Sequence, residues 1–238
     1  MLENKKFEND NFVLYSPDSL NYITKGMEEI LDESLSLYKN IFDVENFRKV
    51  QINYFDNLED FRNFIYELRG EKESLPEYAK GTFDKGMINA YISSNIDEGS
   101  QLYIKKRYNA SHELFHIMYQ ELVWKKNNLP RIVWFDEGMA QLFSGEYESK
   151  LEDYDNFVKK IISDTKTIPN LNELSHGSKF ETEEYSGYRL SLISVKYIYD
   201  KIGIDEFKKL LLDTDRIYEY GENVLNEIFE IYKPKMMV

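Results

Sequence analysis

Cysteine is absent from the 238 residues, which excludes disulfide bonds, thiol catalysis and cysteine-ligated metal sites. No apolar run reaches the roughly 18 residues that a membrane-spanning helix needs, so we expect no membrane partner. The first twelve residues lack the apolar segment of a signal peptide. We therefore expect a cytoplasmic protein, and a secreted one only if a leader has been trimmed.

Basic residues are also few. The chain has 30 Lys and Arg against 43 Asp and Glu, which gives a net charge of −13. Binding to phosphates needs a basic surface, so we expect no nucleic-acid partner. Hydrophobic residues make up 42% of the chain and aromatic residues 15%, which is enough to fill a core and excludes a disordered chain.

Strands and helices are both predicted in the first half of the chain. Strands are expected at Asn11–Pro17, at Val50–Phe55, over Gly81–Ser94 as a hairpin turning at Asp84-Lys85-Gly86, and at Gln101–Lys106. Helices are expected from a Ser19 cap to about Asn40, and over Leu58–Arg69 between an Asn57 cap and Gly70.

The second half is predicted to be helical. Its expected helices run from a Ser111 cap to about Lys125, from near Asp136 past Phe143, over Leu151–Ser163, over Tyr185–Ile202 to an end at Gly203, and over Asp205–Leu212 and Glu222–Lys233. This order predicts an α+β fold. We expect a single domain, 1–238, with an N-terminal α/β lobe to about residue 126 and a helical C-terminal lobe from about 127.

Two of only three histidines lie four residues apart, in His112-Glu113-Leu114-Phe115-His116. Residues at i and i+4 share one face of a helix, so both imidazoles can reach one ion. Zn²⁺ suits imidazole and carboxylate ligands and leaves a position open for water, whose pKa falls to about 7. Glu113 is placed to accept the proton of that water. In a chain of this composition, chance produces roughly 0.004 such motifs.

A third ligand is available in Asp136 and Glu137, because twenty residues separate His116 from Glu137. That length lets the first helix end, the chain turn at Pro130, and a second helix return with an acid in its first turn. Spacing favours Glu137 as the ligand, and Asp136 competes with it on the same argument. The alternative is a solvated acid at a helix N-terminus, where the helix dipole stabilises negative charge.

The motif HELFH followed by W-F-D-E-G-M-A-Q resembles the gluzincin pattern HExxH…W-x-x-E-G-x-A of zinc metallopeptidases. It is most similar to the peptidase MA-like group, which is related to the M1 aminopeptidases, and the resemblance covers about Ala110–Gly145. It implies a zincin-like fold, in which a small mixed sheet with helices precedes a helical lobe and an active-site helix lies between them. It also implies one Zn²⁺, Glu137 as third ligand and Glu113 as general base.

Further residues take roles from the same resemblance. Tyr188 matches a Tyr-x-x-Ser stretch that supplies a donor to the oxyanion, with Tyr185 and His176 as alternatives. Gln141 stands where related enzymes often place an Asp, and its amide oxygen would hold the second nitrogen of His112 or His116. A partly exposed polar residue is the plain alternative for Gln141.

Gly86, Met87, Ile88 and Asn89 lie where gluzincins keep the edge strand that pairs with substrate. The M1 aminopeptidases carry an acidic G-x-M-E-N there, which holds a free amino terminus. This chain has no Glu at that place, which favours cutting within chains.

The predicted function is a zinc-dependent peptidase that acts on a peptide or protein substrate through an activated water. One alternative is a toxin-like or processing protease with a single protein target. The other is a catalytically silent zincin-fold binding module. A silent module would be expected to have lost Glu113 or a metal ligand, and the sequence has lost none of them.

Overall fold

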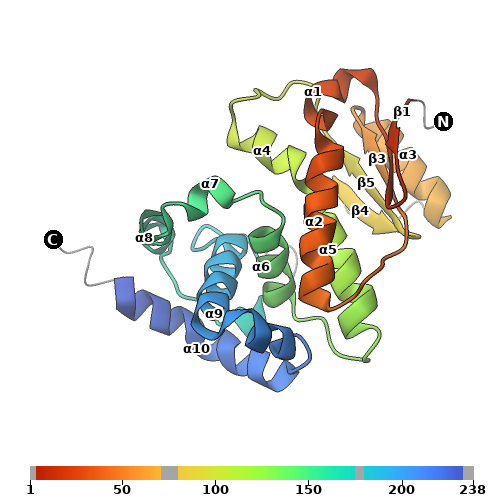
Figure 1. Cartoon of the computed structure of the whole chain (residues 1–238). Coiled ribbons are helices and arrows are strands. Elements are labelled where there is room, and N and C mark those ends of the chain that lie inside the picture. Colours follow the sequence, from red (N-terminus) through yellow and green to blue (C-terminus); the bar gives the residue numbers. More distant parts are fainter. Residues whose placement is uncertain (1–3, 71–79, 175–179, 233–238) are drawn as a thin grey trace. The chain divides into compact units, whose positions relative to one another are not determined.

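The computed structural model describes residues 4–70, 80–174 and 180–232 (Figure 1). These residues form helices and one five-stranded mixed sheet, so the predicted α+β class is confirmed. The chain divides into two compact units, Met1–Ile117 and Met118–Val238. All strands of the sheet belong to the first unit, and the second unit is helical over its described part.

The sheet of the first unit has the order β1-β2-β3-β5-β4. Its strands are β1 (Lys5–Glu8), β2 (Phe12–Tyr15), β3 (Val50–Phe55), β4 (Gly81–Asp84) and β5 (Met87–Tyr91). The three central strands run parallel, and β1 and β4 pair antiparallel to their neighbours. The predictions for β2, β3 and the hairpin are confirmed. Strand β1 was not predicted, because its sequence KKFE has no alternating pattern.

The hairpin turn has two consecutive residues with positive φ, Lys85 at 47° and Gly86 at 83°. That backbone is typical of the tight turns that match the twist of two paired strands.

The first unit also contains six helical segments in its described residues: η1 (Asp18–Leu20), α1 (Asn21–Thr24), α2 (Met27–Phe42), α3 (Leu58–Arg69), α4 (Gln101–Arg107) and α5 (Asn109–Tyr119), which ends just beyond the unit boundary. Helix α3 has the predicted bounds. The Asn57 side chain accepts hydrogen bonds from the backbone N–H groups of Glu59 and Asp60, and Gly70 follows in the left-handed conformation.

Two predictions in this unit are wrong. The helix expected from Ser19 to Asn40 is interrupted at Gly26, whose φ of 72° is not helical. Ser19 does not cap it and instead donates a hydrogen bond to Asp56. The strand expected at Gln101–Lys106 is helix α4, because the Ser100 side chain caps it by accepting from the N–H of Tyr103.

Helix α5 lies against the core of its unit. The side chains of Leu114, Phe115 and Ile117 are fully buried. The ring of Phe115 meets Tyr38 of α2 edge to face, with centroids 5.1 Å apart. This apolar face fixes which side of the helix remains for polar residues.

The second unit contains η2 (Gln120–Trp124, π-helical), α6 (Val133–Phe143), α7 (Glu148–Leu151), α8 (Tyr154–Asp164), η3 (Leu171–Glu173), α9 (Gly187–Leu210) and α10 (Thr214–Tyr232). Gly203, at φ 73° and ψ 170°, kinks α9 where the sequence predicted one helix to end. Helix α10 begins eight residues before the predicted Glu222.

Helix α6 packs closely on α9. A Cβ atom on Gly138 would lie 2.5 Å from the backbone oxygen of Ser191 and 2.6 Å from a methyl carbon of Val195. Only glycine therefore permits this approach of the two helices. Trp134 is buried in the same helix and donates its indole N–H to Asn172 at 3.2 Å.

Among the helices that the structure describes, none is both long enough and apolar enough to span a membrane.

Candidate metal centre

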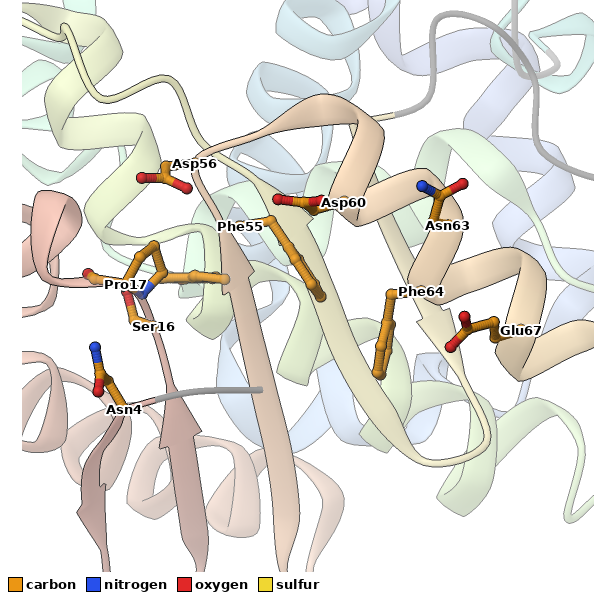
Figure 2. Close-up of a pocket in the computed structure, with 10 residues that line it drawn as sticks. Asn4, Ser16, Pro17, Phe55, Asp56, Asp60, Asn63, Phe64 and Glu67 are labelled. Carbon is orange, nitrogen blue, oxygen red and sulfur yellow. Dashed lines mark hydrogen bonds between the residues drawn. The ribbon is translucent and has the colours of Figure 1, made fainter. Parts of the chain in front are cut away.

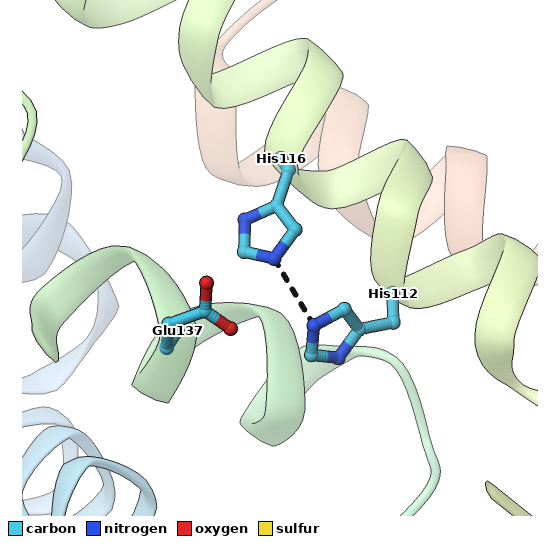
Figure 3. Close-up of side chains that lie close together, drawn as sticks. All are labelled: His112, His116 and Glu137. Carbon is cyan, nitrogen blue, oxygen red and sulfur yellow. Dashed lines mark hydrogen bonds between the residues drawn. The ribbon is translucent and has the colours of Figure 1, made fainter. Parts of the chain in front are cut away.

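Helix α5 presents its two histidines one turn apart. The Nε2 atoms of His112 and His116 are 3.0 Å from each other, and the ring centroids are 4.7 Å apart at 77° (Figure 3). Both Nε2 atoms are thus directed at a common point, which is the arrangement that the i, i+4 spacing predicts.

A buried hydroxyl cluster ties α5 to α2 immediately before His112. The Ser111 hydroxyl lies 2.7 Å from the Ser34 hydroxyl and 2.8 Å from the Tyr38 hydroxyl. Tyr38 also donates to the backbone oxygen of Ser111 at 3.1 Å. Ser111 was predicted to cap the helix, and this is wrong, because α5 already begins at Asn109 and Ser111 is fully buried within it.

Glu113 lies on the side of α5 that faces the sheet. Its Oε1 atom is 3.8 Å from the point that a Cβ on Gly81, the first residue of β4, would occupy. Burial of the Tyr54 side chain on β3, and secondarily the negative charge of Glu113, raise the pKa of the Tyr54 hydroxyl. Glu113 therefore stands beside the histidine pair and near one end of β4.

The strand containing Gly86, Met87, Ile88 and Asn89 is not an edge strand. Strand β5 pairs with β3 on one side and with β4 on the other, so its backbone groups are already used. Ile88 and Asn89 are fully buried, and Asn89 accepts a hydrogen bond from the Asn53 amide at 2.7 Å. The prediction of an edge strand there is wrong. Among the strands described, β4 lies at this edge of the sheet.

Helix α6 carries the two candidate acids, and Arg131 binds both. The Arg131 guanidinium lies 2.5 Å from an oxygen of Asp136 and 3.2 Å from Oε1 of Glu137. Asp136 is 1% exposed and Glu137 is 5% exposed. Arg131 was not among the residues predicted for the site. Its position, five residues before Asp136 and six before Glu137, is the signal that could have indicated it.

One ligand atom from each of His112, His116 and Glu137 lies within 4.8 Å of the others (Figure 3). Asp136 is not in this group. Two nitrogens bound to a tetrahedral zinc ion stand about 3.3 Å apart, close to the 3.0 Å between the two Nε2 atoms. Two imidazoles and a carboxylate are also a donor set that zinc prefers, so these residues fit the ion.

Gln141 is buried one turn after Glu137 and is not partly exposed. Its amide N–H group donates to the backbone oxygens of Glu137 and Tyr188, both at 3.1 Å. It therefore joins α6 to the first turn of α9. The predicted hydrogen bond from Gln141 to a histidine stays a prediction.

The candidate oxyanion donors are placed in part. The ring of Tyr188 meets Phe180 edge to face at 4.6 Å, and Tyr185 is half-buried before α9. The role predicted for the Tyr188 hydroxyl stays a prediction, and His176 lies outside the described residues.

Comparison with known proteins adds no family to this geometry. No protein-family model matches the sequence, and no curated protein matches it with significance. The function is therefore argued from the residues of the site.

Proposed function

We propose that this chain is a zinc-dependent peptidase with a zincin-like fold, of the gluzincin type and closest to the peptidase MA-like group. The convergence of His112, His116 and Glu137 is the observation that carries the proposal. It is supported by the W-x-x-E-G-x-A pattern around Glu137 and by the mixed sheet that precedes the helices.

His112, His116 and Glu137 would hold the ion. Bound zinc supplies Lewis-acid chemistry, by lowering the pKa of water and polarising a carbonyl group. Arg131 holds Oε1 of Glu137 at 3.2 Å, which restricts the carboxylate before an ion arrives. The apolar face of α5 and the hydroxyl cluster at Ser111 fix the direction of the two imidazoles.

Glu113 acts as general base. It lies next to His112 in the sequence, belongs to the same helix and is not part of the ligand group. Its carboxylate accepts a proton from the attacking water and passes it to the amine that leaves. General bases need to be within hydrogen-bond reach of the proton they take.

Tyr188 is proposed to donate a hydrogen bond to the oxyanion. Gln141 supports it, because the Gln141 amide binds the Tyr188 backbone oxygen at 3.1 Å and so sets the start of α9 relative to α6. A donor contributes only when it is aimed at the oxygen of the transition state.

The substrate backbone is proposed to pair with β4 rather than with β5. Strand β4 begins at Gly81, beside the Glu113 carboxylate, and its outer edge has no partner strand among the residues described. The segment Gly86–Asn89 contains no glutamate that would hold a free amino terminus, which favours cleavage within chains.

The test is digestion of a peptide library by the zinc-loaded protein, read by mass spectrometry. Glu113→Gln should keep zinc and lower kcat by at least about 10²-fold, because the amide cannot take a proton. Glu29→Gln, a matched change on the exposed side of α2, should leave kcat unchanged. Absence of cleavage by the zinc-loaded wild type, or a fully active Glu113→Gln protein, would contradict the proposal.

The oxyanion donor is tested in the same assay. Tyr188→Phe should lower kcat by up to about 10²-fold with KM little changed, and Tyr185→Phe should not. The reverse result would move the role to Tyr185.

A further inference from the structure

A cavity of about 590 Å³ lies in the first unit, beside β3 and α3 (Figure 2). It opens where the parallel strands β2 and β3 end, next to α3. Ligands of α/β proteins commonly bind at the carboxyl ends of parallel strands. The lining residues are Asn4, Ser16, Pro17, Tyr54, Phe55, Asp56, Asp60, Asn63, Phe64 and Glu67.

Two aromatic rings form the wall of this cavity. The rings of Phe55 on β3 and Phe64 on α3 have centroids 5.3 Å apart and are tilted by 44° (Figure 2). Phe55 also packs edge to face on Phe61, which is fully buried, at 5.9 Å. The aromatic wall is therefore attached to the core of the unit and is preformed.

The charged residues that line the cavity are all acidic. Asp56, Asp60 and Glu67 line it, and none of its ten lining residues is basic. Asp60 and Glu67 lie on α3 seven residues apart, about 10 Å along the helix axis at 1.5 Å per residue. Phe64 stands between them, so two carboxylates flank an aromatic surface.

We propose that this cavity binds a linear polyamine. One terminal ammonium group meets Asp60, the other meets Glu67, and the methylene chain between them lies over Phe64 and Phe55. An ammonium group near a ring face is attracted by the ring as well as by carboxylates. The volume is within the range of small-molecule sites.

The combination of carboxylates and aromatic rings in the cavity favours a polyamine over other classes of ligand. An inorganic cation would use the carboxylates and leave the aromatic wall without a role. An apolar ligand would leave three carboxylates facing it. A polyamine carries charge and methylene groups at the spacing that α3 presents, and this binding is independent of the zinc site.

Isothermal titration calorimetry with spermidine at low salt tests the proposal. Binding to the wild type should weaken as salt rises, since the carboxylates are solvent-accessible. Asp60→Asn and Glu67→Gln should each raise Kd by about 3-fold, the scale of one exposed charge pair, and together by about 10-fold. Phe64→Leu should also raise Kd, because it removes the ring.

Glu59→Gln is the matched control, since it removes the same charge from an exposed position of α3 outside the cavity. It should leave the Kd for spermidine unchanged. Putrescine, which is too short to reach both Asp60 and Glu67, should bind more weakly than spermidine. An equal loss in Glu59→Gln, equal affinity for magnesium chloride, or no heat of binding in the wild type would overturn the proposal.

Discussion

Replacement of Arg131 by methionine tests how the two acids of α6 are held. Arg131 contacts Asp136 at 2.5 Å and Glu137 at 3.2 Å, and methionine keeps much of the side-chain length without the charge. The Asp136 carboxylate is 1% exposed, so water cannot replace the guanidinium. We expect the folded state to lose stability and Asp136 to be the main cause.

The size of the loss follows from burial. Removing one partner of a buried ion pair costs about 3–5 kcal/mol. The Arg131 side chain is 32% exposed, which lowers the expected cost to about 2–3 kcal/mol. For a chain of this length, that corresponds to a fall in Tm of about 5–10 °C.

Thermal unfolding of a double-mutant cycle provides the assay. Asp136→Asn removes the buried negative charge, so the double variant Arg131→Met/Asp136→Asn should lose less stability than the two single variants added together. Arg131→Lys should fall between wild type and Arg131→Met, because lysine keeps the charge and loses the planar fork. A strictly additive cycle, or an Arg131→Met variant as stable as wild type, would refute the reasoning.

Two further predictions concern the two units separately. Ser111→Ala should lower the free energy of unfolding by about 1–3 kcal/mol in denaturant melts, because the buried Tyr38 and Ser34 hydroxyls lose a partner, whereas the same change at exposed Ser36 should have little effect. Burial raises the pKa of Tyr147 to about 12, so between pH 10 and pH 12 the folded state keeps a proton that the unfolded state loses. The free energy of unfolding should therefore fall across that range. Denaturant melts at several pH values should show this fall, and it should be less steep in Tyr147→Phe.

The fold predictions that are confirmed, such as helix α3 and the hairpin turn, rest on signals between residues close together in the sequence. Helix α3 was bounded correctly because Asn57 and Gly70 act on their own neighbours in the chain. The hairpin turn was located because Gly86 adopts a positive φ, which glycine permits without steric cost. Such signals need no knowledge of the rest of the molecule.

Non-local pairing explains the errors. The sequence of β5 predicts a strand, but it does not indicate the position of that strand in the sheet. In the structure β4 lies at the edge, and β5 lies between β4 and β3. Strand β1 is short and polar, and it forms only because β2 is beside it.

The same distinction between local and non-local signals applies to the candidate site. Helical spacing alone placed His112 and His116 on one face, and the structure has both on α5. The contact of Ser111 with Tyr38 joins residues 73 positions apart, and no local pattern indicated it. Spacing favoured Glu137 only slightly over Asp136, since the two acids are neighbours at the start of one helix.

Zinc stoichiometry, measured by elemental analysis after dialysis, tests the central claim most directly. The wild type should retain close to one zinc per chain, and His112→Ala, His116→Ala and Glu137→Gln should each lose most of it, because two protein ligands hold the ion far less well than three. His176→Ala, the same change at the one histidine outside the motif, should keep it. Full zinc content in the His112 and His116 variants, or loss in Asp136→Asn with retention in Glu137→Gln, would contradict the assignment.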